Sequence, residues 1–287
     1  ERQGVLPVLS LGTLALDVLI IIAGSILLMW VGELISEFGI GNGVSLIIFA
    51  GIVVRIPSSL GQLVFTFDQS QLPIYLAAIL ASLLIVLGVV TVTEAERPIP
   101  ITYAKQVRGN RTYGGLSTYL PLRVNQAGVI PIIFALSILL FPQMILEFLS
   151  HSSVSAVSGI SYTLLGLLAN AWFYAIAYFV LVFLFTYFYT AVTFDPEAVA
   201  NNLQKSGAFI PGVRPGPSTA EYISHVLTRL TLVGALFLGA IAVLPLILRS
   251  LTGIQSLAIG GTALLIVVSV VIDVVKKVDA QISVREY

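Results

Sequence analysis

The stretch LPIYLAAILASLLIVLGVVTVT, Leu72 to Thr93, contains no charged residue in 22 positions. An α-helix rises 1.5 Å per residue, so a run of this length crosses the roughly 30 Å hydrocarbon core of a bilayer. Its apolar residues are continuous and do not alternate with polar ones, which favours a helix over a strand of a membrane barrel. The stretch therefore predicts a membrane-spanning helix.

The composition of the whole chain agrees with that interpretation. Of the 287 residues, 57% are hydrophobic and 10% are charged, whereas an ordinary soluble domain has about 25% charged residues. A water-soluble globule of this size could not bury so much apolar surface. The formal net charge is zero, and the absence of cysteine excludes disulfides and thiolate metal ligands. The sequence predicts a multi-span membrane protein.

Seven apolar runs are candidate spans, and together they predict an all-α, multi-span transmembrane helix bundle. They are Leu11 to Val31, Val44 to Phe67, Leu72 to Thr93, Val124 to Leu146, Leu164 to Thr193, Leu230 to Leu248 and Ser256 to Val275. The second run is interrupted by RIPSS, where Arg55 either reaches an interface or faces a watery funnel. Trp30 and Trp172 fit the aromatic belts at the membrane interfaces.

The basic residues predict the orientation of these spans. If the spans alternate, eleven of the fourteen basic residues lie on one side, in residues 94–123, in residues 194–229 and in the tail. By the positive-inside rule this side is cytoplasmic. The predicted organisation is three spans in 1–93, a basic loop in 94–123, two spans in 124–193, a second loop in 194–229, and two spans and a tail in 230–287. Connections on the opposite side, such as Ser150 to Ser161, are rich in Ser and Gly and are expected to be short loops.

The predicted membrane interior lacks the residues that carriers and enzymes use. The third to sixth spans contain no Asp, Glu, Lys, Arg or His, which disfavours a coupled transporter. Asp17 and Asp273 are expected near the interfaces. His151 and His225 are predicted on opposite sides, so they cannot share a metal ion. No catalytic motif is present, and we expect neither a metal nor a cofactor.

Two further motifs interrupt the apolar pattern. In GIGNG, Gly39 to Gly43, we expect Asn42 or Gly43 to cap a helix that begins at Val44, rather than a phosphate site. In VNQAGVIPIIFA, Val124 to Ala135, Pro131 is expected inside the helix, where it removes a backbone hydrogen bond and permits a kink.

Four separated motifs resemble the SecY family, the pore subunit of the protein-conducting channel, in its bacterial-type form. They are GIGNGVSLIIFAGIV (Gly39 to Val53), LPLRVNQAGVIPIIFA (Leu120 to Ala135), NLQKSGAFIPGVRPG (Asn202 to Gly216) and GGTALLIVV (Gly260 to Val268). The resemblance covers the whole chain, but it matches only the fourth to tenth of the family's ten helices. The first residues, ERQGVLPVLS, do not read as a signal peptide, and we expect a fragment or a truncated form.

The resemblance implies roles for particular residues. A pore ring would contain Val44, Ile48, Ile133 and Ile266. One half of a lateral gate would contain Asn125, Gln126 and Pro131. A docking surface for the SecA motor ATPase or the ribosome would contain Arg97, Lys105, Arg108, Arg111, Lys205 and Arg214.

The resemblance also implies partners and a location. The partners would be SecE and SecG subunits, signal peptides and nascent chains, ribosomal RNA and the lipid bilayer, in the plasma membrane with a cytoplasmic C-terminus. Two other classes remain open at this point. A secondary transporter for a small solute would require an intramembrane ionisable site. A structural or lipid-handling protein would leave two long loops with arginines held by Gly and Pro unexplained.

Overall fold

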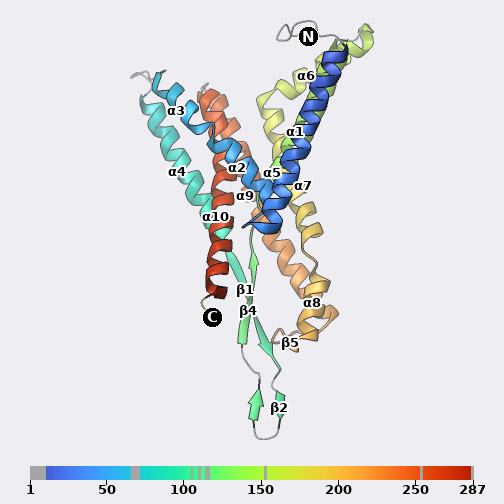
Figure 1. Ribbon diagram of the computed structural model, residues 1–287, viewed down its shortest axis with the longest axis vertical. Coiled ribbons are helices and arrows are strands. Elements are labelled where there is room, and N and C mark those ends of the chain that lie inside the picture. The colour runs from blue at the N-terminus through green and yellow to red at the C-terminus, as the bar shows by residue number, and fades with distance from the viewer. Residues whose placement is uncertain are drawn as a thin grey trace. The chain divides into compact units, whose positions relative to one another are not determined.

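The computed structural model describes residues 11–65, 72–104, 106–108, 111–113, 117–151, 154–252 and 255–285 (Figure 1). The chain divides into two compact units. One contains Glu1–Phe67 and Val270–Tyr287, and the other contains Asp68–Ser269. Helix α10 (Gln255–Arg285) contributes to both units.

The first unit is built on a close contact between α1 (Leu11–Phe38) and α2 (Gly43–Val53). Gly43 lies so close to the backbone of Gly32 that a Cβ there would collide with the Gly32 carbonyl oxygen. The Ser36 hydroxyl donates to Gly32 O at 2.9 Å and accepts from Gly43 N at 2.8 Å. The Asn42 side chain accepts from Ser45 N at 3.2 Å, so the predicted cap is confirmed. Helix α2 ends at Val53, and α3 (Ile56–Phe65) follows.

The second unit is mostly helical. It contains α4 (Leu72–Glu94), α5 (Ile130–Ser150), α6 (Ser155–Ala169), α7 (Ala171–Thr193), α8 (Pro196–Lys205) and α9 (Pro217–Thr252). Helix α7 packs along α9, and α5 packs against α6 and α7. Each of these helices also exposes large apolar side chains, as expected for helices surrounded by lipid.

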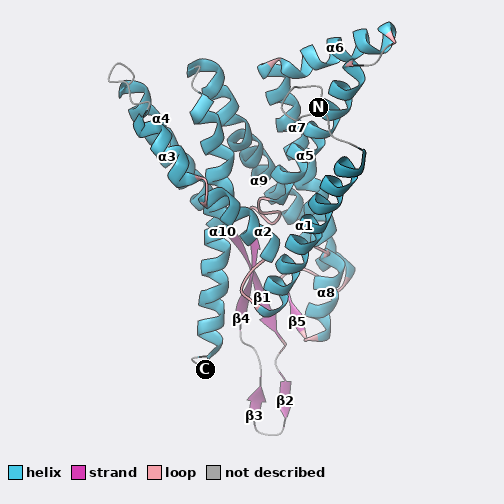
Figure 2. Cartoon of the chain, turned by 45° about the horizontal axis from the view of Figure 1, so that its top comes forward, coloured by secondary structure: helices cyan, strands magenta, loops and turns pink. Residues whose placement is uncertain are grey.

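A small antiparallel sheet lies at one end of these helices (Figures 1 and 2). Its strands β1 (Glu96–Tyr103), β4 (Ser117–Arg123) and β5 (Ala208–Phe209) are arranged in the order β4-β1-β5. Strands β2 (Gln106–Arg108) and β3 (Arg111–Tyr113) form a separate hairpin between β1 and β4. Pro98 and Pro100 are tolerated in β1 because β5 pairs only with Thr102 and Tyr103, which leaves that edge open beside the prolines.

The structure corrects three boundaries in the sequence analysis. The second expected span is two helices separated by Val54 and Arg55, as the interruption indicated. The fifth expected span, Leu164 to Thr193, is divided at Asn170 between α6 and α7. The expected loop over 150–161 is wrong, because α6 begins at Ser155.

The structure also bears on two class-level predictions, the number of spans and the fold class. Within the described residues, five helical segments are long and apolar enough to span a bilayer. They are Gly12–Phe38, Tyr75–Glu94, Ile130–Ser150, Ala171–Lys205 and Pro217–Ile247. The count of seven therefore stays a prediction. The all-α class is confirmed for the apolar part, whereas residues 94–123, expected as a loop, form most of the sheet.

Leu122→Ala tests the importance of the sheet's apolar face. Leu122 is 1% exposed in a cluster with Ile99, Ile210, Ile223 and Val226. Truncation should lower the free energy of unfolding by about 2–5 kcal/mol, because it leaves a cavity. Denaturant unfolding in detergent measures the change. Tyr119→Ala, at an exposed position of the same strand, is the matched control and should have little effect.

Candidate functional site

The sheet, the loop after β5 and the first turns of α9 share one hydrophobic core. Ile99 and Leu122 come from the sheet, Ile210 from the loop, and Ile223 and Val226 from α9. Partly buried residues of α8, Val199 and Leu203, pack against the same cluster. Burying an aliphatic side chain contributes about 1.5–3 kcal/mol, so this small core fixes the loop to the helices. We call the exposed surface of the described residues in 94–123 and 194–229, where docking is predicted, the docking surface.

The backbone on either side of Arg214 is fixed by a sequence of turns. Val213 N donates to Ile210 O at 3.0 Å, and the intervening Pro211 and Gly212 (φ 84°) occupy the positions expected for a type II turn. After the arginine, the buried Thr219 hydroxyl donates to Arg214 O at 2.9 Å. The Arg214 side chain is exposed. The turn therefore presents a positive charge from a defined backbone.

Four of the other predicted basic residues are described in the same two segments. Arg97 is exposed on β1, and Lys205 is exposed at the last position of α8. Arg108 and Arg111 form the register pair beside residues 109–110, so they flank the hairpin tip as expected. Lys105 lies outside the described residues.

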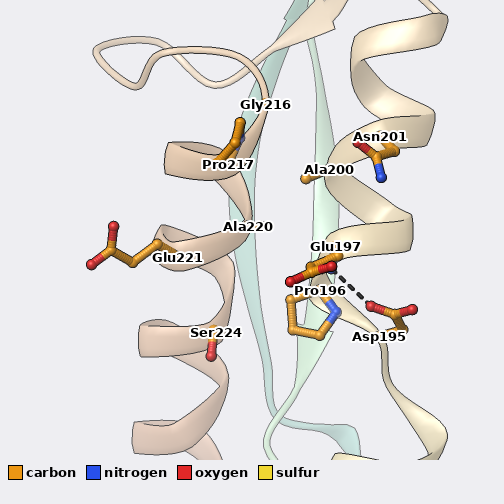
Figure 3. A pocket seen from close by; sticks show the side chains of 10 residues that line it. All are labelled: Asp195, Pro196, Glu197, Ala200, Asn201, Gly216, Pro217, Ala220, Glu221 and Ser224. Atoms are coloured by element: carbon orange, nitrogen blue, oxygen red, sulfur yellow. Dashed lines mark hydrogen bonds between the residues drawn. The ribbon is translucent and has the colours of Figure 1, made fainter.

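The sequence analysis missed a cleft between α8 and α9 (Figure 3). It has a volume of about 640 Å³, and its walls include Asp195, Glu197 and Glu221. Asp195 caps α8, accepting from Glu197 N at 2.9 Å and Ala198 N at 3.1 Å. Figure 3 shows the Glu221 side chain pointing away from α8. The docking surface thus offers carboxylates as well as arginines.

The candidate gate residues lie between β4 and α5. Asn125 is 6% exposed, and its Nδ2 donates to Gly128 O at 3.3 Å. Its Oδ1 has no hydrogen-bond partner within the described part of the chain. Gln126 is half-buried. A glycine of α9, Gly234, lies against this segment, and a Cβ there would be 2.5 Å from Val124 O.

The expectation that Pro131 interrupts a helix is wrong. Helix α5 begins at Ile130, so Pro131 occupies its first turn. Proline is favoured there because the first amide groups of a helix have no intrahelical acceptor. The internal proline of α5 is Pro142, which the sequence analysis did not identify.

The four candidate ring residues are divided between the two units. Val44 and Ile48 lie one turn apart on α2 in the first unit, where Val44 is 52% exposed and Ile48 is half-buried. Ile133 is half-buried on α5 in the second unit, and Ile266 is buried on α10. The ring therefore stays a prediction. Ser36 and Gly32, which fix the start of α2, were missed because their sequence context is an ordinary apolar helix.

The fold and this surface define a class of protein. The chain is a multi-span helical membrane protein with a compact, charged sheet-and-loop structure at one end of its second unit. The family model described as SecY matches residues 3–275, so the chain belongs to the SecY family.

Comparison with individual proteins supports this membership. The chain is 46% identical over 296 residues to the protein translocase subunit SecY of Mycobacterium tuberculosis, covering 97% of this chain and 64% of that protein. It is 45% identical to the protein of the same name from Corynebacterium glutamicum, covering 92% of this chain and 61% of the relative. It is 41% identical to the protein of the same name from Streptomyces coelicolor, covering 99% of this chain and 64% of the relative. The chain thus spans less than two thirds of the length of these relatives.

Solved structures share the fold. A structure described as that of a protein conducting channel has a TM-score of 0.57 and 22% sequence identity. The match covers 88% of this chain and 62% of that one. A second structure, from a study of the SecY plug domain, has a TM-score of 0.58, 20% identity, and coverage of 88% and 63%.

Gly234→Ala tests the contact between α9 and the candidate gate segment. The added Cβ would meet Val124 O at 2.5 Å, so the backbones must move apart. We expect a loss of about 1–3 kcal/mol in the free energy of unfolding, as for other overpacked sites. Thermal unfolding in detergent measures it. Gly24→Ala is the control, because nothing lies within 4 Å of a Cβ at that helical position; equal effects at both glycines would contradict the contact.

Proposed function

We propose that this chain forms part of the pore subunit of a protein-conducting channel. In this role it lets unfolded secretory proteins cross the plasma membrane and lets membrane proteins enter the bilayer. The chain makes or breaks no bond itself. Its C-terminus is cytoplasmic, on the side of the docking surface.

One observation carries this proposal. Relatives named protein translocase subunit SecY are 41–46% identical to this chain over 92% or more of its length. The match to the SecY family model, over residues 3–275, includes the predicted spans and both segments of the docking surface. The transporter alternative is not favoured, because the third to sixth predicted spans contain no Asp, Glu, Lys, Arg or His.

The proposed pore ring consists of Val44, Ile48, Ile133 and Ile266. These side chains are branched and apolar, so they cannot coordinate an ion. A narrow apolar ring excludes ions by dewetting, yet it can still contact an extended polypeptide. The spacing of Val44 and Ile48 supports the role, since residues four apart project from the same helix face.

The proposed lateral gate uses the start of α5. Asn125 and Gln126 are polar residues beside an otherwise apolar helix, and the Asn125 Oδ1 lacks a hydrogen-bond partner among the described residues. Burying an acceptor without a hydrogen-bond partner costs free energy. A rearrangement of this segment that gives the Asn125 Oδ1 a partner would recover that cost. Signal peptides and emerging membrane segments would pass beside it. Pro131 would set the start of the helix rather than a kink within it.

The proposed docking surface binds the SecA motor ATPase or the ribosome. Arg97, Lys205 and Arg214 are exposed there, and Arg108 and Arg111 flank the hairpin tip; Lys105 completes the proposed set. Arginines on a protruding hairpin suit ribosomal RNA, because contacts with phosphates release counterions. SecE and SecG are the proposed membrane partners.

A single cysteine at Ile133 tests the pore ring, because the chain has no cysteine of its own. The Ile133→Cys change is made in the chromosomal gene, so that the protein assembles in its natural context. A secretory precursor with one cysteine is arrested during transfer. We expect a disulfide between the two, and its position along the precursor should move as the arrest point moves.

Ile138→Cys is the matched control on the same helix. Five residues of helix place it roughly 140° around the axis from Ile133, and it is exposed. It should form little disulfide with the precursor. If Ile133→Cys forms no disulfide in an assembled and engaged complex, or if both positions react equally, the pore-ring assignment is wrong.

Arg214→Glu tests the docking surface. The side chain is exposed and only its backbone oxygen contacts Thr219, so the fold should survive. Reversing the charge on a fixed turn should weaken motor binding by about tenfold or more, equivalent to about 1.4 kcal/mol. Binding of the purified motor to membrane vesicles measures this change.

Arg229→Glu is the control, since Arg229 is also exposed, at the end of the docking surface further along α9, but is not one of the predicted docking residues. Its effect on motor binding should be small. Equal motor affinity for wild type and Arg214→Glu would show that Arg214 does not bind the motor. Its charge would then serve only to orient the chain in the membrane.

A further inference from the structure

Helix α6 has no role in the proposed channel, and its length sets it apart from its neighbours. Its 15 residues extend about 22 Å, too short for a hydrocarbon core of roughly 30 Å. It connects α5 and α7, each long and apolar enough to span. Since α5 begins after β4 and α7 ends before β5, α6 lies at the ends of these helices away from the sheet (Figure 2).

Helix α7 begins with its own N-cap residue, so α6 and α7 are two helices and not one bent helix. Asn170 has an extended backbone (ψ 117°), and its side chain accepts from Trp172 N at 3.0 Å and Phe173 N at 3.4 Å. Such a cap satisfies amide groups that have no intrahelical acceptor. Helix α6 is therefore a separate element that can lie at an angle to α7.

The surface of α6 is divided into three stripes at helical spacing. The first faces the protein, where α6 packs against α5 and α7. It consists of Val157, Ser158, Ser161, Leu165 and Leu168, which are all buried or half-buried. The Ser161 hydroxyl donates to Val157 O at 2.8 Å, so its burial leaves no free donor.

Apart from Tyr162, the exposed part of the helix separates into a stripe of large apolar residues and a stripe of small ones. Ile160, Leu164 and Leu167 share the apolar stripe at positions i, i+4 and i+7, with 63%, 42% and 46% exposure. Gly159, Thr163 and Gly166 share the other stripe at the same spacing, and all are exposed. A helix surrounded by water would not show three large aliphatic side chains in one row, and a spanning helix would need more than the 15 residues of α6.

We propose that α6 lies along the boundary between lipid headgroups and acyl chains, on the bilayer face opposite the sheet. In this position the Ile160 stripe points into the acyl chains and the Thr163 stripe points to water. The third stripe holds the helix against α5 and α7. The partner of this surface is thus the lipid leaflet itself.

Two observations favour lipid over a protein partner. Residues 154–172 contain no charged side chain, so they offer a protein partner no charge complementarity. Tyr162 and Trp172 are 62% and 60% exposed, and both residue types concentrate at membrane interfaces, where one end of the ring is apolar and the other is wet. The stripe is also continuous with flanking helices that are themselves apolar enough to span.

Depth-dependent fluorescence quenching tests the proposal. Single-cysteine forms Ile160→Cys, Leu167→Cys and Thr163→Cys of the full chain are labelled with an environment-sensitive dye and reconstituted in vesicles of phosphatidylcholine and phosphatidylglycerol. The quenchers are lipids carrying a nitroxide near the headgroup or near the chain end, and aqueous iodide. Thr163→Cys is the matched control, since it is exposed on the same helix.

The probes at positions 160 and 167 should be quenched several-fold more by the shallow lipid quencher than by the deep one, and little by iodide. The probe at 163 should instead be quenched more by iodide than by either lipid quencher. Equal iodide quenching at all three positions would place α6 in water. Strongest quenching by the deep nitroxide would make it a spanning segment, and shielding from every quencher would show that a protein covers it. Each of these three results would overturn the proposal, whatever the outcome of the cross-linking test of the pore.

Discussion

The hydrocarbon core of a membrane offers no hydrogen-bond partner, and this constraint shapes the chain. Every backbone amide and carbonyl at that depth needs a hydrogen-bond partner. A membrane-crossing segment can supply all these partners by itself only as a helix. The apolar runs are helices for this reason, and the sheet forms from the charged, proline-containing segments outside them. Helix starts follow the same requirement: Asn42, Asn170 and Asp195 each place a side-chain oxygen on otherwise unpaired amides.

A second, smaller core orders the surface that meets the solvent. Strands β1 and β4, the loop before α9 and the first turns of α9 bury residues against one another, so the Arg214 turn is part of a folded structure rather than a free loop. Helix α9 belongs to both regions. Its early residues Ile223 and Val226 complete this core, while later turns pack along α7. The position of the docking surface relative to α7 is therefore set by one continuous helix.

The sequence predicted what depends on composition and failed where the outcome depends on tertiary contacts. The run from Leu72 to Thr93 matches α4 to within one residue, because length and polarity alone decide a span. The sheet was missed because Pro98 and Pro100 argue against a strand, and only the open edge beside them makes β1 possible. Helix α6 was missed because Ser and Gly indicate loops in water, whereas this helix is supported by α5 and α7. The apolar ring residues carry no signal of their own, so only the family resemblance identified them.

The two ends of α5 are held by different interactions, which matters because this helix carries Ile133. At the sheet end, the segment before α5 lies against Gly234, where the contact leaves no room for a Cβ. At the other end, α6 packs beside α5 and presents aliphatic side chains to its surroundings. The first contact is steric and tied to one position, whereas the proposed contact of the α6 stripe with a fluid leaflet would keep the same burial as the stripe moves sideways. The start of α5 is thus tied through Val124 to one position on α9, whereas its far end is held by packing against α6.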